Sequence, residues 1–454
     1  MIKNTNQILT QNLVKVEGIL RNFVEEAIEK ESKGQLTINS IEKMLGVAIG
    51  AITQLLLSMA GTLLSNIVLT TVEEYCSCGK KLIKVKKDSQ TNILSMFGYI
   101  PIVRDILHCR RCHKGYGVID RLIEINEKHR ITKDMTEVIT YVAQLVPSFE
   151  RASEVLKKLL YLDVSSTQIQ IVSEEVGKKV FEKEMYEAKE AYEKPEEAAP
   201  QELKKDRKEG VLYIFIDGSQ VNTRVEDIKG STWHEMKLGL VFSDRDVIRR
   251  ADGSSIIMKK EYVSYFGSVT EFKKVLFAAA ARAGYGKFKE IVVIGDGAQW
   301  IWNMCEEIFP DAVTILDFYH LSENVHDYSK AIYPDDEIKR KRWVKEVLEK
   351  VSADKVDEAI EIVEKAEVKI ISDMTVNLPV YMKNNRERIR YKTYKENDYY
   401  IGSGPIESGN KVVIQQRMKQ SGMRWSIEGG QYIAALRAKH ESNKWDDVIK
   451  VVNG

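Results

Sequence analysis

The chain has 454 residues, of which 44% are hydrophobic and 30% are charged. This composition excludes an intrinsically disordered chain, and the length allows about two to four domains with cores of their own. The formal net charge is only +1, so any binding of nucleic acid must depend on local basic surfaces. The N-terminus, MIKNTNQILTQ, is polar and unlike a signal peptide, so we expect a cytoplasmic protein without disulfides.

Residues 1–70 are predicted to be helical. Within them, residues 44–72 contain no charged side chain, and this stretch is long enough to cross a bilayer. Polar side chains such as Thr53, Gln54 and Ser58 interrupt it, however. We therefore favour a buried or self-associating helix over a transmembrane span, and expect this region to support oligomerisation rather than membrane binding.

Residues 71–130 are predicted to form a small β-rich module that contains two close cysteine pairs. Cys76 and Cys78 form a CxC pair, and Cys109 and Cys112 form a CxxC pair. Four thiolates suit a tetrahedral structural Zn²⁺ site, and either of two flanking histidines could replace one thiolate. The alternative is four reduced cysteines with no metal, because short spacings also arise by chance.

Residues 131–180 return to helical periodicity and contain a possible helix-turn-helix. The connection falls around residues 162–165, where Ser165 or Ser166 would cap the second helix. A second helix placed in the major groove would read base edges; the alternative is an ordinary helical hairpin. The candidate DNA contacts are Ser166, Thr167, Gln168 and Gln170.

Residues 181–209 are rich in Glu and Lys and predict a charged helical linker, after which a new domain begins. Three strands followed by alternating helices and strands predict a mixed sheet covered by helices over residues 210–334. Residues 335–395 resemble a helical insertion, and residues 396–454 form a final helical region. Cys305 falls in a predicted helix and is expected to be a packed core thiol. The expected order is strand 211–217, strand 232–243, strand 261–266, helix 270–283, strand 290–295, helix 298–308, strand 312–316 and helix 320–330.

Two aspartates follow apolar, β-branched runs in this domain. Asp217 comes after VLYIFI and Asp296 after IVVIG, and each precedes a glycine. Neighbouring strands would bring the two carboxylates together, and carboxylate oxygens are preferred ligands of Mg²⁺. The alternative is that each Asp-Gly pair only makes a turn after a strand.

Two further acidic positions join this pattern. Glu407 lies in GSGPIESGNK, where Pro405 suits the first turn of a helix. Asp317 and His320 follow the strand VTIL and could hydrogen-bond to each other, contact phosphate or orient a metal-bound water. A structural pair at a helix N-terminus explains Asp317 and His320 equally well.

The segment around Glu407 is locally basic. Between Lys383 and Lys439 there are twelve Lys and Arg residues against five Asp and Glu residues. Such a surface could bind phosphates, with interleaved aromatic rings stacking on unpaired bases, although a run of charge is more often only a solvated face. The candidate phosphate contacts are Arg386, Arg388, Arg390, Lys392, Lys411, Arg417, Lys419 and Arg424. The candidate stacking residues are Tyr394, Tyr399, Tyr400 and Trp425.

Together, FIDGS, IGDGAQW, LDFYHL and GSGPIESGNK resemble motifs of the DDE transposases of bacterial insertion sequences. The order of these residues is similar to the Mutator-like lineage and, within it, to the ISLre-two group, once catalogued as an uncharacterised protein family. The resemblance covers most of the chain. It departs at Asp317, where that lineage often has Cys, so the role of Asp317 stays open.

The resemblance implies an α/β RNase H-like catalytic core with a helical insertion, preceded by the helical and zinc-binding modules. It implies that Asp217, Asp296 and Glu407 bind two Mg²⁺ or Mn²⁺ ions, with Asp317 and His320 near the DNA. The implied activity is metal-dependent hydrolysis at the element's ends and strand transfer into target DNA, by a nucleoid-associated homodimer or larger assembly on double-stranded DNA. The alternatives are an RNase H-like nuclease or resolvase without strand transfer, and an inactive domesticated DNA-binding protein.

Overall fold

The computed structural model describes residues 2–70, 75–76, 78–113, 115–117, 129–200, 207–252, 255–366, 368 and 376–454. Parts of the expected cysteine module, linker and insertion, at residues 118–128, 201–206 and 369–375, lie outside the described residues. The chain divides into two compact units. One comprises residues 1–173 with 452–454, and the other residues 174–451.

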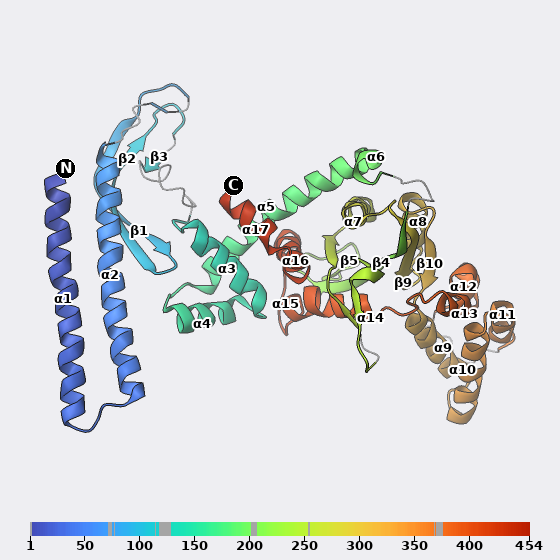
Figure 1. Cartoon of the computed structure of the whole chain (residues 1–454). Helices are drawn as coiled ribbons and strands as arrows, with labels where there is room; N and C mark the ends of the chain where they lie inside the picture. Colours follow the sequence, from blue (N-terminus) through green and yellow to red (C-terminus); the bar gives the residue numbers. More distant parts are fainter. Residues whose placement is uncertain are drawn as a thin grey trace. The chain divides into compact units, whose positions relative to one another are not determined.

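The first unit begins with two long helices, α1 (Ile2–Ser32) and α2 (Ile38–Thr70), which lie side by side and antiparallel (Figure 1). A β-hairpin packs against α2, and its strands are β1 (Ile83–Ser95) and β2 (Gly98–His108), followed by β3 (Gly115–Gly117). The helix and the hairpin approach closely at Gly61, where a Cβ atom would lie only 1.9 Å from the carbonyl oxygen of Pro101. The small residue is therefore required for this packing.

Within the part of the chain that the structure describes, residues Ile38–Ser65 of α2 form the one helix long and apolar enough to cross a membrane. Only 17% of its most apolar window is buried. Length and composition alone are weak support for a span, because core helices of soluble proteins meet the same criterion. Burial within a single chain is therefore wrong for much of this helix, whereas self-association, the other form of the expectation, stays a prediction.

Three helices complete the first unit: α3 (Lys133–Leu145), α4 (Phe149–Leu160) and the start of α5 (Ser166–Glu193). They surround one apolar cluster that includes Met135, Leu156 and Ile169. The hydroxyl of Ser165 accepts the N–H of Gln168 at 3.2 Å, which is the N-cap expected for the second helix of the pair. The predicted pair of helices with a short connection is therefore present, and its reading as a DNA-binding helix-turn-helix stays a prediction.

The second unit is built on a five-stranded sheet with the order β10-β9-β4-β5-β8. β4 pairs parallel with β9, and β9 with β10, whereas β5 is antiparallel to both of its neighbours. The prediction of a mixed α/β sheet is confirmed. Its strands are β4 (Lys208–Asn222), β5 (Trp233–Ser243), β8 (Glu261–Phe266), β9 (Phe288–Gly295) and β10 (Val313–Leu316).

The expected strands and helices of this unit agree with the observed ones to within about three residues, except at the end of β4. β4 continues to Asn222 because its antiparallel pairing with β5 extends to the pair Asn222 and Trp233. A small ribbon follows β5, comprising the 3₁₀ turn η1 (Asp244–Asp246), β6 (Val247–Arg249) and β7 (Ser255–Ile257).

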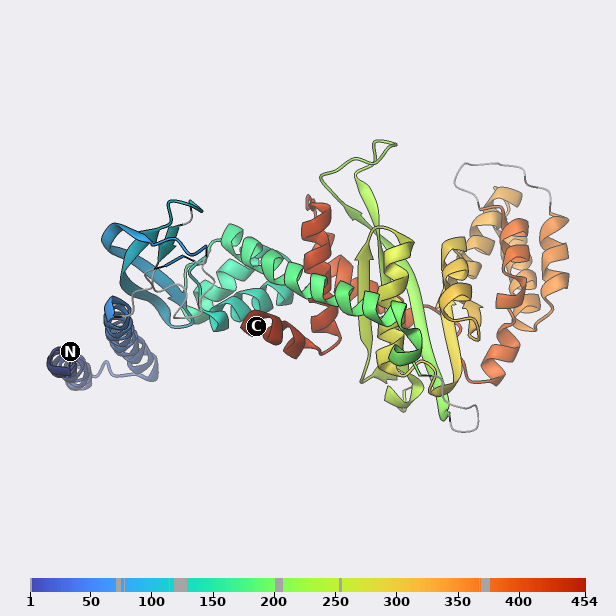
Figure 2. The ribbon, with the colours of Figure 1, turned by 90° about the horizontal axis from the view of Figure 1, so that it is seen from above.

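Helices follow the sheet strands in sequence and continue into the insertion, whose helices gather beyond the β10 edge of the sheet (Figures 1 and 2). The helices that pack on or continue from the sheet are α6 (Pro195–Ala198), α7 (Val269–Ala283), α8 (Gln299–Ile308) and α9 (Phe318–Ile332). Those of the insertion are α10 (Glu337–Ser352), α11 (Val356–Glu364), α12 (Leu378–Asn384), η2 (Arg386–Arg388) and α13 (Tyr391–Glu396). The chain ends with α14 (Gly404–Gly409), the π-helical segment η3 (Asn410–Gln415), α15 (Gln416–Met418), α16 (Ile427–Glu441) and α17 (Trp445–Asn453).

Helix α16 covers the outer edge of β8. Gln431 accepts the N–H of Phe266 at 2.6 Å and donates to the carbonyl of Ser264 at 3.2 Å. Ser442 accepts the N–H of Tyr262 at 2.8 Å. These side chains satisfy edge groups that could otherwise pair with another chain.

A buried charge cluster ties β8 to its surroundings. Glu261 is 6% exposed, accepts a hydrogen bond from Arg282 Nη2 at 2.6 Å and also contacts Lys444. Burial alone would raise the pKa of the Glu261 carboxyl, but the two cations outweigh it and lower the pKa.

Candidate functional site

The two aspartates come together beside the central strand β4 and the end of its neighbour β9. β4 and β9 run parallel, with Phe215 paired with Ile294; Asp217 follows in β4, and Asp296 comes directly after Gly295, the last residue of β9. Both carboxylates line one small hollow. The expectation that neighbouring strands bring them together is therefore met.

Of the two Asp-Gly pairs, only Asp296 and Gly297 make a turn after a strand. β4 continues through Asp217 and Gly218 to Asn222, so the turn alternative is wrong for Asp217. The N–H of Gly218 donates to Asp217 Oδ1 at 2.7 Å, and the N–H of Ala298 donates to Asp296 Oδ1 at 2.9 Å. One carboxylate oxygen of each residue is thus used locally.

The surroundings of Asp217 disfavour its charged form. Burial is the main cause, the nearby Asp296 adds to it, and together they raise the pKa of Asp217 to about 6. The N–H of Gly218 and the charge of His320 oppose this rise without cancelling it. Because burial beside a second carboxylate disfavours the charged form of Asp217, this hollow is suited to a bound cation.

Asp317 and His320 form the hydrogen-bonded pair expected from the sequence. Asp317 is fully buried, caps α9 and accepts His320 Nδ1 at 2.6 Å. It also accepts the backbone N–H of Ser403 at 2.9 Å, so it joins α9 to the start of α14. Both oxygens of Asp317 are therefore occupied by hydrogen bonds.

This pairing controls the charge of His320. The hydrogen bond that His320 donates to Asp317 is the main cause that raises the pKa of His320 to about 9, although burial opposes it. Asp296 and Asp217 contribute in the same direction. At neutral pH a cationic imidazole therefore faces the aspartate pair.

Helix α14 packs against the aspartate hollow, which Ser403 and Ile406 also line. Glu407, one turn after Ser403, is exposed and accepts a hydrogen bond from the Ser403 hydroxyl. The structure thus brings the segment of Glu407 to the carboxylates, with Glu407 itself at the rim rather than in the lining.

Asn410 is a site residue that sequence reasoning missed. Its amide donates to Asp217 Oδ2, and its buried Oδ1 has no hydrogen-bond partner. Asn410 also begins the π-helical segment η3, a distortion that is frequent at functional sites. The only signal in the sequence was its position three residues after Glu407, on the same helical face.

Tyr381, from the insertion, was also missed. Its hydroxyl donates to the carbonyl of Asp296 at 2.8 Å. The adjacent Gly297 has φ +94°, and a Cβ there would lie 2.7 Å from the Tyr381 hydroxyl. Any other residue at position 297 would therefore strain the tight turn after Asp296.

Two of the expected DNA contacts are wrong. Arg417 and Trp425 are 1% and 4% exposed, and the guanidinium of Arg417 lies 5.3 Å from the centre of the Trp425 ring. They are buried because the segment after η3 returns to the end of β4, where the backbone of Trp425 hydrogen-bonds to Asn222 and Arg224. Tyr394 is likewise buried, and Tyr400 packs on Tyr213 in an edge-to-face arrangement with centroids 5.0 Å apart.

The remaining basic residues divide into two groups. Arg386, Arg388, Arg390 and Lys392 each form an ion pair, at 2.7, 3.3, 2.6 and 3.8 Å, so a phosphate would have to displace an acid there. Lys411, Lys419 and Arg424 are exposed. The pKa of Lys419 is lowered by partial burial, although the nearby Asp217 opposes this.

The four cysteines of the first unit come together. The sulfur atoms of Cys76, Cys78, Cys109 and Cys112 all lie within 4.8 Å of one another. Cys76 and Cys109 are buried, and the N–H of Cys112 points to Cys109 Sγ at 3.5 Å. The cluster can hold a metal such as zinc, since thiolate sulfurs in this number suit a tetrahedral site.

The fifth cysteine is separate from this cluster. Cys305 is buried in α8, and burial raises its thiol pKa to about 12. It is a packed core thiol, as expected.

The candidate base-reading residues of α5 lie on its first turns. Ser166, Gln168 and Gln170 are half-buried and Thr167 is exposed. Ile169 and Val172 of the same helix are buried in the three-helix cluster, and this packing fixes the orientation of α5.

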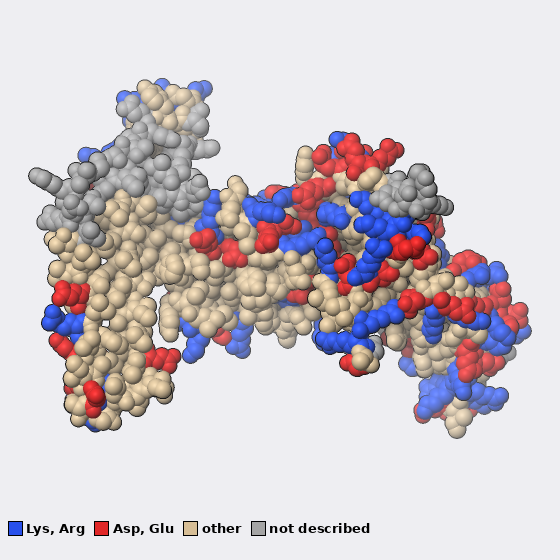
Figure 3. Space-filling view, viewed as in Figure 1, with Lys and Arg blue, Asp and Glu red and all other residues tan. Residues whose placement is uncertain are grey.

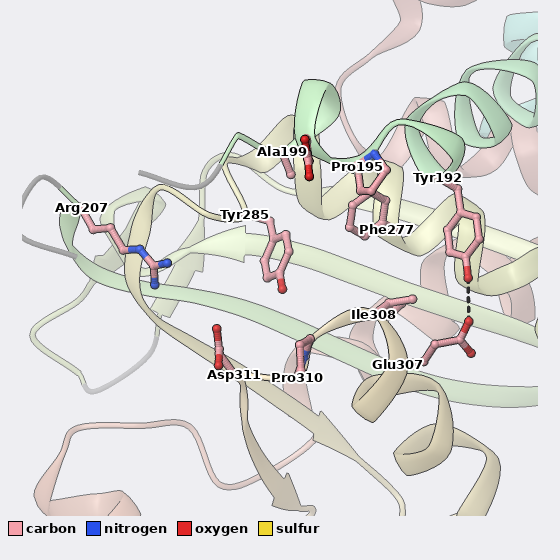
Figure 4. Close-up of a pocket in the computed structure, with 11 residues that line it drawn as sticks. Tyr192, Pro195, Ala199, Arg207, Phe277, Tyr285, Glu307, Ile308, Pro310 and Asp311 are labelled. Atoms are coloured by element: carbon pink, nitrogen blue, oxygen red, sulfur yellow. Dashed lines mark hydrogen bonds between the residues drawn. The ribbon is translucent and has the colours of Figure 1, made fainter. Parts of the chain in front are cut away.

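A larger cavity, of about 590 Å³, lies near the amino-terminal ends of the parallel strands (Figure 4). Arg207, Tyr285 and Asp311 line it from positions just before β4, β9 and β10. The Tyr192 hydroxyl donates to Glu307 at 2.6 Å on its wall. We locate the candidate chemistry at the acidic hollow instead, because that is where the buried titratable groups converge.

The fold and these sites define an α/β protein with an acidic cluster at one edge of a mixed five-stranded sheet and a four-cysteine cluster that can bind metal. Residues 35–450 match the uncharacterised protein family UPF0236, and the chain belongs to that family. A search of curated proteins gave no match.

Proposed function

We propose that this protein is a DDE-type DNA transposase with an RNase H-like core. The observation that carries the proposal is the convergence of Asp217, in β4, and Asp296, just after β9, on one hollow that residues at the start of α14 also line. The strand order, in which the first strand lies centrally and only the second is antiparallel, supports an RNase H-like core.

The residues present fit a divalent cation. The hollow offers two carboxylates, and the unpartnered Asn410 Oδ1 is a further oxygen donor beside them. Asp217, Asp296 and Glu407 would hold Mg²⁺ or Mn²⁺, with Glu407 approaching from the rim. A cation bound there would supply Lewis-acid activation of a nucleophile and stabilise charge on the phosphate.

The chain's own groups support phosphodiester chemistry at this hollow. The cationic His320, held by Asp317, would contact a scissile phosphate or stabilise negative charge on it. Lys411, Lys419 and Arg424 would bind the DNA backbone beside it. Two such steps, hydrolysis at the element's end and attack of the freed 3′-hydroxyl on target DNA, need no covalent intermediate.

The N-terminal modules would hold DNA and partner subunits. We propose that the cysteine cluster binds a structural Zn²⁺ and that the helix pair α4–α5 contacts double-stranded DNA through Ser166, Gln168 and Gln170. Both ends of an element must be processed together, so the active form would be a homodimer or larger assembly at the nucleoid.

The test is an assay of the full chain with DNA carrying the element's ends, target DNA and Mg²⁺. We expect cleaved ends and joined product from the wild type, and neither from Asp217→Asn, Asp296→Asn or Glu407→Gln. Asp335→Asn, at an exposed site, is the matched control.

Two results would redirect the proposal. Cleavage without joined product would support a nuclease or resolvase. Sequence-specific DNA binding without any cleavage would support a domesticated DNA-binding protein. Processing that survives all three substitutions would show that the acidic hollow is not the active site.

A further inference from the structure

Helix α2 carries an exposed apolar seam with heptad spacing, which we call the heptad seam. Its members follow one another at intervals of seven, four, three, four, three and four residues. They are Ile38, Leu45, Ile49, Ile52, Leu56, Met59 and Leu63. Alternating steps of three and four place all of them on one face of the helix, which is the pattern of a coiled coil.

The heptad seam faces away from the partners that α2 already has. Ile38, Ile49 and Leu56 are 83%, 60% and 56% exposed. Met44 and Leu57, on other sides of the helix, are buried. The hairpin occupies another part of the helix surface, where Ser65 Oγ accepts the N–H of Val103 at 3.0 Å.

The neighbouring helix α1 extends this apolar surface. Leu13, Leu20, Val24 and Ile28 recur at steps of seven, four and four and are each more than half exposed. Figure 3 shows the visible face of α1 and α2 as largely uncharged, in contrast to the dense charge over residues 174–451. An apolar surface of this extent is unusual for a monomer in water.

We propose that the heptad seam joins two copies of this chain in a coiled coil. A partner of different sequence is usually selected by charged residues beside the seam. From Leu45 to Leu63 those flanking positions are uncharged, and include Gly46, Thr53 and Thr62; Glu42, at the heptad position between Ile38 and Leu45, is the one charge in line with the seam. Over Leu45–Leu63 two identical helices therefore meet without charge repulsion, and the small residues let them approach closely.

A bilayer is the rival occupant, and α1 argues against it. α1 packs along α2, so a lipid-embedded α2 would draw α1 into the membrane. α1 carries charges throughout its second half, among them Glu17, Arg21, Glu25 and Glu29. Charged side chains in a bilayer are strongly disfavoured. A second protein helix covers the heptad seam without moving these charges out of water.

The test is the mass of the full chain by light scattering and sedimentation at micromolar concentration. We expect two chains for the wild type and one chain of 52.0 kDa for the double variant Ile49→Glu, Leu56→Glu. Val47→Glu is the matched control, because Val47 is 75% exposed on the same helix but off the heptad seam. It should keep the mass of two chains, and all three proteins should have the same helix content by circular dichroism.

Crosslinking supplies a second measurement that does not depend on destabilising charges. The variant Leu45→Cys, Leu56→Cys should form intermolecular disulfides whether the helices run parallel or antiparallel, whereas Val47→Cys should not. A monomeric wild type, a charged double variant that keeps its partner, or a wild type that floats with phosphatidylcholine–phosphatidylglycerol vesicles would each overturn the proposal. It does not depend on the proposed function, because DNA processing is not measured.

Discussion

The Asp217 carboxylate should destabilise the protein in the absence of a divalent cation. Its folded-state pKa of about 6 lies above the ordinary value of 3.8, so its contribution to stability is present below pH 3.8 and is lost as the pH rises through about 6. At pH 7.5 the difference corresponds to at most about 3 kcal/mol, since each tenfold change in proton affinity is worth about 1.4 kcal/mol.

Asp217→Asn should therefore stabilise the chain. The new amide keeps an oxygen to accept the N–H of Gly218, and its NH₂ can donate to the unpartnered Oδ1 of a rotated Asn410. We expect a gain of about 2 kcal/mol at pH 7.5 in chelator, which is roughly 4–8 °C in melting temperature for a unit of this size.

Thermal unfolding monitored by circular dichroism measures this gain. It should shrink towards zero at pH 4, where the wild-type carboxyl is protonated. Asp335→Asn, at an exposed site, should change stability by less than about 0.5 kcal/mol. Added Mg²⁺ should raise the melting temperature of the wild type and not that of Asp217→Asn. An Asp217→Asn variant that is less stable than the wild type at pH 7.5 would refute the electrostatic reasoning.

Three further predictions concern other parts of the chain. Glu261→Gln removes the buried acid that pairs with the partly exposed Arg282 and Lys444 and should reduce the free energy of unfolding by about 1–3 kcal/mol, measured by urea titration. In the wild type the lowered pKa of Glu261 means that this contribution is present above pH 4.5 and is lost as the pH falls below it. Cys109→Ser should abolish stoichiometric zinc in protein purified without chelator, measured by atomic emission; an unchanged zinc content would exclude the cluster as the site. Because the pKa of His320 is raised to about 9, the stability from its pairing is full below pH 6.5 and is lost as the pH rises through 9. His320→Gln should flatten the melting temperature over that range, and an unaltered pH profile would contradict the pairing.

The sequence by itself determined the local elements and much of the acidic site. Apolar β-branched runs predicted the strands that carry Asp217 and precede Asp296, because alternation and turn residues act over a few neighbouring positions; the end of β4 was missed because it depends on pairing with β5. The same local signals located the cap at Ser165 and the short connections of the two cysteine pairs. These features depend on residues that are close together in the chain.

Only the tertiary structure decided which side of each segment faces the core. Arg417 and Trp425 lie in a basic, aromatic run that predicts a DNA surface, but long-range packing buries them. Asn410 enters the site because η3 meets β4 across nearly two hundred residues of sequence. The composition of α2 is that of a buried helix, and the sequence alone does not show which of its faces other segments cover. Local sequence fixes the period of a helix, whereas burial depends on contacts between distant segments.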